Sequence, residues 1–322
     1  MYYFEVTIIM TINIKAINDV FYHIKDKAWR FTPDGDSRGY IQPKLLKDLW
    51  FHTGTACNLN CPFCFEGSSP GNDRLQMVTL SDIQPFFKEA VSLGVSHFSF
   101  TGGETFVNGD MIKILDCALD INPCLVLTNA TDPLAEKFEE IEKLKDKKHK
   151  LSFRVSLDYP YETLHDKGRG EGNFRLSLKM MSELNKLGFK VSVARKQKAG
   201  EDKQAEDSLF LPVLKEAGLP EDTNIVSFPE LYTPGSLPEV PQITEACMTT
   251  YKTEEERAQF MCSYSKMVVK IDGKMLVYAC TLVDDDPDYT LGDNLTDAMR
   301  ARVMLRHHRC FSCFASGTSC SE

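Results

Sequence analysis

The chain has 322 residues, of which 43% are hydrophobic, and a formal net charge of −9, which suits one large domain plus a small one. The acidic balance disfavours a nucleic-acid partner, because such a partner needs a basic face. The N-terminus lacks a basic signal leader, and no run reaches the ~18 apolar residues of a membrane span. We therefore expect a cytoplasmic protein without a membrane partner.

Strand and helix patterns alternate from about residue 46 to residue 229. The expected strands are 47–55, 95–100, 124–128, 151–157, 190–195 and 225–228. The expected helices are 80–93, 110–119, 133–147, 174–187 and 202–217. Six strand–helix repeats predict an α/β fold with a parallel sheet.

The C-terminal part of the chain follows a different pattern. Prolines and Gly235 indicate a linker, and Asp272-Gly273 between two apolar runs predicts a β-hairpin. A helix over 295–307 is then expected to lead to Cys310 and Cys313. We divide the chain into an N-terminal extension (1–45), a main domain (46–229), a linker (230–245) and a cysteine-rich module (246–322).

Three cysteines, Cys57, Cys61 and Cys64, stand close together in the run CNLNCPFC. Three thiolates on one loop can hold three irons of a four-iron cluster and leave the fourth iron open to a ligand. The loop follows the first expected strand, so it lies at the C-terminal edge of the predicted parallel sheet. A structural zinc site is the alternative, but it lacks a fourth ligand, because His52 lies too near the strand start.

The C-x3-C-x2-C spacing, with Phe63 before the last cysteine, resembles the signature of the radical S-adenosylmethionine (SAM) superfamily. The run Gly102-Gly103-Glu104 after the second strand resembles that family's Gly-Gly-Glu motif. The resemblance implies a partial (β/α)6 TIM-like barrel and a [4Fe-4S] cluster on the three cysteines. It also implies that SAM binds the open iron and is cleaved reductively to a 5′-deoxyadenosyl radical.

The resemblance and the strand ends together suggest contacts to SAM. Glu104 would accept a hydrogen bond from the methionyl amine, Phe63 would lie beside the adenine, and the two glycines would let the backbone approach the ligand. The other expected contacts are Asn129, Ser156, Asp158 and Arg195, with Arg169 and Arg175 as alternatives to Arg195 at the methionyl carboxylate. As structural alternatives, Ser156 and Asp158 are cap residues and Arg195 forms a surface salt bridge.

A second group of cysteines lies near the C-terminus. The hairpin would bring Cys262 and Cys280 together, ahead of Cys310, Cys313 and Cys320. This pattern resembles the twitch module, a shortened relative of the SPASM domain, and implies one auxiliary [4Fe-4S] cluster on Cys262, Cys280, Cys310 and Cys313, with Cys320 as a possible substitute ligand. Zinc is the alternative, bound by residues drawn from His307, His308, Cys310, Cys313 and Cys320.

In such enzymes an auxiliary cluster either accepts an electron from a substrate radical or ligates or anchors a substrate. We expect the first use, which implies a dehydrogenase-type oxidoreductase. The substrate is a small molecule or a peptide, and the short stretch before the first strand favours a small molecule or a short protein segment. Candidates for the base that deprotonates the substrate radical are Tyr159, His165 and His97. Flavodoxin or ferredoxin would donate the electron. The alternatives are a peptide- or protein-modifying radical SAM enzyme and a non-catalytic iron–sulfur or zinc protein.

Overall fold

The computed structural model describes residues 27–198, 200–229 and 231–316. Its centre is a sheet of eight strands in the order β7-β6-β5-β4-β3-β2-β8-β9. The strands β2 to β7 are parallel and lie side by side in chain order. The predicted α/β class with a six-stranded partial barrel is therefore confirmed.

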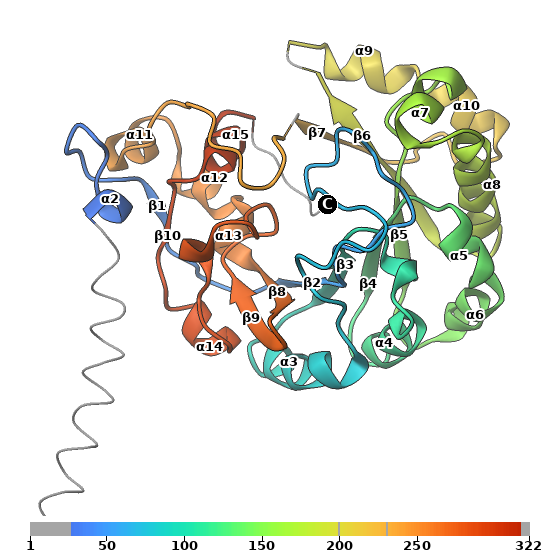
Figure 1. The fold of residues 1–322 in the computed structure, drawn as a ribbon, viewed down its shortest axis with the longest axis horizontal. Coiled ribbons are helices and arrows are strands. Elements are labelled where there is room, and N and C mark those ends of the chain that lie inside the picture. Colours follow the sequence, from blue (N-terminus) through green and yellow to red (C-terminus); the bar gives the residue numbers. More distant parts are fainter. Residues whose placement is uncertain (1–26, 199, 230, 317–322) are drawn as a thin grey trace, which may run out of the picture.

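The strands of the barrel are β2 (Asp48–His52), β3 (His97–Thr101), β4 (Cys124–Thr128), β5 (Leu151–Ser156), β6 (Lys190–Gln197) and β7 (Ile225–Pro229). The helical segments between them are α3 (Leu80–Ser92), η1 (Thr105–Val107), α4 (Met111–Ala118), α5 (Asp132–Glu136), α6 (Phe138–Glu142), η2 (Lys143–Asp146), α7 (Glu162–Arg169), α8 (Asn173–Lys186), α9 (Lys203–Ser208) and α10 (Leu211–Glu216). Figure 1 shows α3 to α8 around the outside of the curved sheet.

Local sequence signals and aromatic packing both position the first helix. The Thr79 hydroxyl accepts the backbone N–H of Asp82, and the Asp82 carboxylate accepts the N–H of Thr79, so a capping box begins α3. The Phe87 ring then packs against Phe51 of β2 and Phe98 of β3, at centroid separations of 5.3 and 4.8 Å. This buried aromatic cluster holds β2 and β3, and therefore the loops that follow them, in a fixed position.

The C-terminal segment packs beside β2 and extends the same sheet (Figure 1). Its elements are α11 (Glu245–Thr250), α12 (Glu254–Ala258), α13 (Met261–Tyr264), β8 (Ser265–Ile271), β9 (Lys274–Tyr278), η3 (Pro287–Tyr289), α14 (Leu295–Ala298), β10 (Val303–Met304) and α15 (His308–Ser316). The predicted hairpin is β8–β9, and both turn residues, Asp272 and Gly273, have the positive φ that this turn requires. The strand β8 runs parallel to β2.

Several predicted helices differ from the structure. The predicted helix over 295–307 is wrong, because Val303–Met304 pairs with β1 (Tyr40–Ile41), which follows the short helix α2 (Lys27–Arg30). The predicted helix 133–147 is broken into α5, α6 and η2, and 202–217 is split into α9 and α10, with Pro212 in the first turn of α10. The helix α7 was not predicted. Within the described residues, no helix has the length and apolar character needed to cross a membrane.

Candidate active site and a second cysteine cavity

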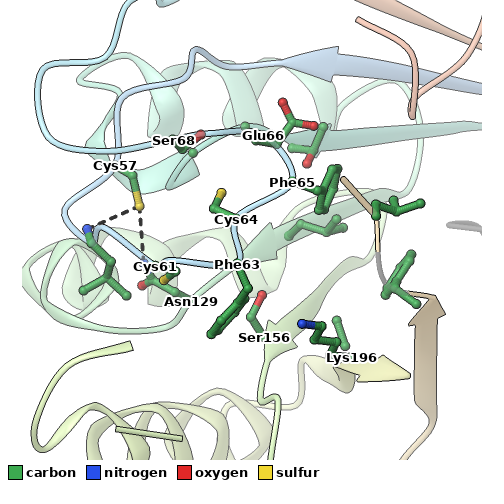
Figure 2. A pocket seen from close by; sticks show the side chains of 18 of the residues that line it. Cys57, Cys61, Phe63, Cys64, Phe65, Glu66, Ser68, Asn129, Ser156 and Lys196 are labelled. Carbon is green, nitrogen blue, oxygen red and sulfur yellow. Dashed lines mark hydrogen bonds between the residues drawn. The ribbon is translucent and has the colours of Figure 1, made fainter. Parts of the chain in front are cut away.

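The loop that carries Cys57, Cys61 and Cys64 follows β2, at the C-terminal edge of the parallel strands. All three side chains line one cavity of about 180 Å³, and Figure 2 shows them on this loop. Burial raises the pKa of the Cys57 thiol to about 11. The Cys57 thiolate therefore needs a nearby cation to form, and an iron of a cluster would supply that charge. Three thiols on one loop, facing one cavity, fit the attachment of a four-iron cluster by three ligands.

The two glycines of the Gly-Gly-Glu motif pack against the segment that leads into the cysteine loop. A Cβ atom on Gly103 would lie 2.3 Å from the Ala56 carbonyl oxygen, and one on Gly102 would lie 2.7 Å from the Gly54 carbonyl oxygen. Gly102 also has φ +153. Both glycines line the cavity. Their lack of a side chain lets β3 and the cysteine loop meet at backbone distance, in addition to the predicted approach to a ligand.

Glu104, the third residue of the motif, is 2% exposed and is not among the residues that line the cavity. Its carboxylate accepts the Thr128 hydroxyl and the Asn129 backbone N–H, each at 2.7 Å. Burial raises the pKa of this carboxyl group, and these hydrogen bonds oppose that shift. In this structure Glu104 braces the end of β4, and its contact with the methionyl amine stays a prediction.

Asn129 lies between this brace and the cysteine loop. Its side-chain amide donates to the Asn58 side-chain oxygen at 3.0 Å and lies 4.0 Å from the Cys57 sulfur. Asn129 also lines the cavity (Figure 2). Asn129 therefore supports the loop that carries the three cysteines, and its contact with SAM stays a prediction.

The Phe63 ring lines the cavity (Figure 2) and has two cations near it. The Arg169 guanidinium carbon lies 5.7 Å and the Lys196 Nζ 5.2 Å from its centroid, and such contacts favour a fixed ring. A Cβ atom on Gly168 would lie 2.3 Å from the ring, so this glycine in α7 makes room for it. The Phe63 ring therefore lines the same cavity as the three thiols, and its contact with adenine stays a prediction.

The strand ends supply the remaining polar groups of the cavity. Ser156, Asp158, Arg169 and Arg195 all line it. Asp158 is paired with Arg169, whose pKa rises because the carboxylate outweighs the effect of burial. The Arg195 guanidinium binds Glu201 and Asp207, each at 2.6 Å, and the residue is 3% exposed. Arg195 is therefore not a surface residue, and its contact with the methionyl carboxylate stays a prediction.

Four other candidates lie outside the set of cavity-lining residues: Arg175, His97, His165 and Tyr159. Arg175 is exposed and paired with Glu162. His97 begins β3, at the opposite edge of the sheet from the cysteine loop. His165 is 1% exposed, and burial lowers its pKa to about 4. The roles that we expected for these residues stay predictions.

The second group of cysteines also converges. Cys262, Cys280, Cys310 and Cys313 line one small cavity beside β8 and α15. Burial raises the pKa of Cys310 to about 12, so these thiols also need a cation to ionise. Cys320, the substitute ligand, lies outside the described residues.

The histidines of the zinc alternative lie elsewhere. His307 Nε2 lies 3.4 Å from Asp285, His308 packs against the His307 ring, and neither residue lines the second cavity. Two buried cations lie near the thiols instead: Arg309, which lines the cavity, and Lys266, which follows Cys262 on the chain by four residues. A donor set of four thiols with cations nearby suits an iron–sulfur cluster, whose thiolate ligands leave it with a net negative charge.

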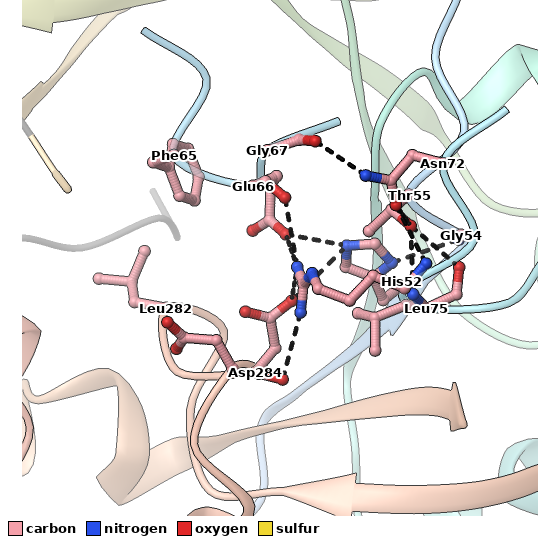
Figure 3. A network of polar contacts seen from close by, with 12 residues as sticks. His52, Gly54, Thr55, Phe65, Glu66, Gly67, Asn72, Leu75, Leu282 and Asp284 are labelled. Carbon is pink, nitrogen blue, oxygen red and sulfur yellow. Dashed lines mark hydrogen bonds and ion pairs between the residues drawn. The ribbon is translucent and has the colours of Figure 1, made fainter. Parts of the chain in front are cut away.

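Sequence analysis missed a buried polar network between the two halves of the molecule. Arg74 Nη2 donates to Glu66 at 3.1 Å and to Asp284 at 2.9 Å, and His52 Nε2 lies 3.3 Å from Glu66 (Figure 3). Burial and the Glu66 carboxylate raise the pKa of Asp284 to about 6. Arg74 and Asp284 are 210 residues apart, so no local pattern could have signalled this pair.

The fold and site together define an α/β partial barrel with a three-cysteine loop at the C-terminal ends of its strands. Residues 51–195 match the family model of the Radical SAM superfamily. This stretch, which holds both the cysteine loop and the Gly-Gly-Glu run, is therefore a radical SAM domain by its match, as the motifs predicted.

One curated protein is similar over part of the chain. The chain is 35% identical over 140 residues to the antilisterial bacteriocin subtilosin biosynthesis protein AlbA of Bacillus subtilis (strain 168). The match covers 43% of this chain and 30% of AlbA, so the chain spans under a third of that relative.

Two solved structures share the fold. Streptococcus suis SuiB bound to S-adenosylmethionine aligns with a TM-score of 0.59 and 15% identity, covering 80% of this chain and 66% of SuiB. Histidine-tagged anSMEcpe with bound AdoMet aligns with a TM-score of 0.56 and 15% identity, covering 83% of both chains. At this identity the likeness establishes the fold alone.

Proposed function

We propose that the protein is a radical SAM enzyme, which holds a [4Fe-4S] cluster on Cys57, Cys61 and Cys64. The observation that carries the proposal is the single cavity lined by these thiols, by Gly102 and Gly103, and by polar strand-end groups. When bound, the cluster and SAM supply a 5′-deoxyadenosyl radical that abstracts hydrogen from a substrate. The chain's own residues hold the thiols on one loop, place Phe63 for stacking and surround the radical with a lined cavity.

The convergence of Cys262, Cys280, Cys310 and Cys313 supports a second [4Fe-4S] cluster. A cluster there would take the electron from a substrate radical as the substrate loses a proton, which completes a two-electron, dehydrogenase-type oxidation. Flavodoxin or ferredoxin is the proposed donor of the electron that starts each turnover.

For the substrate, we favour a peptide over a small molecule. The 35% identity to a protein of bacteriocin biosynthesis supports the peptide-modifying alternative. SuiB, which shares the fold, has been seen bound to precursor peptide SuiA.

The proposal is tested by iron and sulfide analysis after anaerobic reconstitution. We expect about eight irons per chain in the wild type, about four in a Cys57/Cys61/Cys64→Ala variant, and about eight in the control Cys117→Ala, whose thiol lies outside both cavities. Under a reductant, the wild type should form 5′-deoxyadenosine from SAM and the triple variant should not. Cleavage that survives the triple substitution would refute the proposed function. If the wild type held about four irons and the triple variant none, with zinc present, the second cluster alone would be refuted.

A further inference from the structure

Arg309 links three parts of the chain that are far apart in sequence. It lies on α15 directly before Cys310, and its side chain is fully buried. Its Nη1 donates to the Leu282 carbonyl oxygen at 2.6 Å, and its Nη2 donates to the carbonyl oxygens of Phe65 at 3.1 Å and Tyr232 at 2.8 Å. One guanidinium therefore binds the residue after Cys64, the second residue after Cys280, and the segment after β7.

The residues that Arg309 holds lie between the two cysteine cavities. Leu282 lines both cavities, and Phe65 lines the first. The Leu282 backbone N–H also lies 3.4 Å from the Cys280 sulfur. Leu282 therefore separates the two sites, and Phe65 lies on the side of the first. We call these two residues the wall; each stands within two positions of a cysteine that we expect to be a ligand.

We propose that Arg309 is a positioning residue that fixes this wall and whose charge raises the reduction potential of the auxiliary cluster. The second half of the inference rests on the proposed second cluster, and the first half does not. Reduction adds one negative charge to a cluster, so a buried cation beside it favours the reduced state.

The geometry requires arginine rather than a general cation. A guanidinium offers a planar fork of donors and can bond several carbonyl oxygens at once, whereas an ammonium group is a compact point charge on a flexible stem. Arg309 forms one long ion pair, with the Asp285 carboxylate at 3.8 Å. Its neighbour Arg306 is 31% exposed and paired with Asp286 and Asp288, at 3.1 and 2.8 Å, so its charge is already balanced.

Three variants separate the role of the guanidinium donors from the role of the charge. Arg309→Met removes the donors and the charge, whereas Arg309→Lys removes the planar set of donors but keeps the charge. Arg306→Met is the matched control. Hydrogen exchange of the reconstituted protein reports on the wall. Exchange of residues 64–67 and 281–285 should rise together in both Arg309 variants and stay at the wild-type level in Arg306→Met. An EPR redox titration of the auxiliary cluster should give a more negative potential in Arg309→Met, with most of the shift restored in Arg309→Lys.

The positioning role and the effect of the charge can each be refuted separately. The positioning role of Arg309 would be refuted if exchange rose only in α15, or if exchange of residues 64–67 and 281–285 did not change. An unchanged potential in Arg309→Met, or an equal shift in Arg306→Met, would overturn the role of the charge. If the wild type holds only about four irons per chain, both the proposed second cluster and the proposed effect of the Arg309 charge are refuted. The hydrogen-exchange data still test whether Arg309 positions Phe65 and Leu282. Loss of the first cluster's iron in wild type would instead count against the proposed function.

Discussion

The carboxylate of Glu104 accepts the backbone N–H of Asn129 at 2.7 Å, and the Asn129 side chain in turn lies against the cysteine loop. The acid of the Gly-Gly-Glu motif thereby connects the ends of β3 and β4 to the loop that carries Cys57. Because the carboxylate is buried and used by backbone and hydroxyl donors, its loss should affect the protein even without a ligand.

Replacing Glu104 by Gln should therefore destabilise the metal-free protein. The amide keeps the shape of the side chain but presents a donor where both oxygens now accept, so we expect a loss of about 1–3 kcal/mol in unfolding free energy. Urea denaturation measures it, with the exposed Glu139→Gln as the control. Equal stability of the two variants would contradict the bracing role.

Gly103→Ala should prevent normal loading of the first cluster. Its Cβ would lie 2.3 Å from the Ala56 backbone oxygen, so the start of the cysteine loop must move. Iron after reconstitution should fall from about eight toward about four per chain. Gly109→Ala is the matched control, since its Cβ meets nothing within 4 Å and its φ needs no glycine. Full iron loading in Gly103→Ala would show that the loop tolerates the displacement.

Arg74→Met should destabilise the protein by about 3 kcal/mol, because it leaves the Glu66 and Asp284 carboxylates buried without their cation. Thermal or urea unfolding measures the change. The exposed Arg300→Met, whose pair with Asp297 is on the surface, should cost less than about 1 kcal/mol. Adding Asp284→Asn to Arg74→Met should recover part of the loss; no recovery would mean that Arg74 acts through packing alone.

His165 should make the protein sensitive to mild acid. Burial lowers its pKa from 6.5 to about 4, so the folded state holds the neutral ring while the unfolded state binds a proton. This stabilisation is complete above the unfolded pKa and is lost as the pH falls toward the folded pKa, by roughly 3 kcal/mol at most. Unfolding of His165→Phe should depend less on pH between about 7 and about 4. If the unfolding free energy of His165→Phe depended on pH as strongly as that of the wild type, the lowered pKa of His165 would be contradicted.

Much of the site was predictable because its signals are local. The C-x3-C-x2-C run and the Gly-Gly-Glu motif each occupy a few consecutive residues, and each follows a strand whose apolar pattern is clear. Parallel strands bring their C-terminal ends to one edge, so Cys57, Gly102, Asn129 and Ser156 were expected together and do line one cavity. The helix over 295–307 was mispredicted because pairing of Val303 with Ile41 overrode local helical preference.

By itself, the sequence determined the six strands of the barrel, the clustering of three cysteines after the first of them and the turn of the C-terminal hairpin, since these depend on spacing and on the conformations of single residues. Only the tertiary structure decided how the two cysteine sites meet. Arg74 reaches Asp284 across 210 residues, and Arg309 reaches Phe65 across 244. Bonds of this kind have no period along the chain, because they form only after packing has brought distant segments together and excluded water from them.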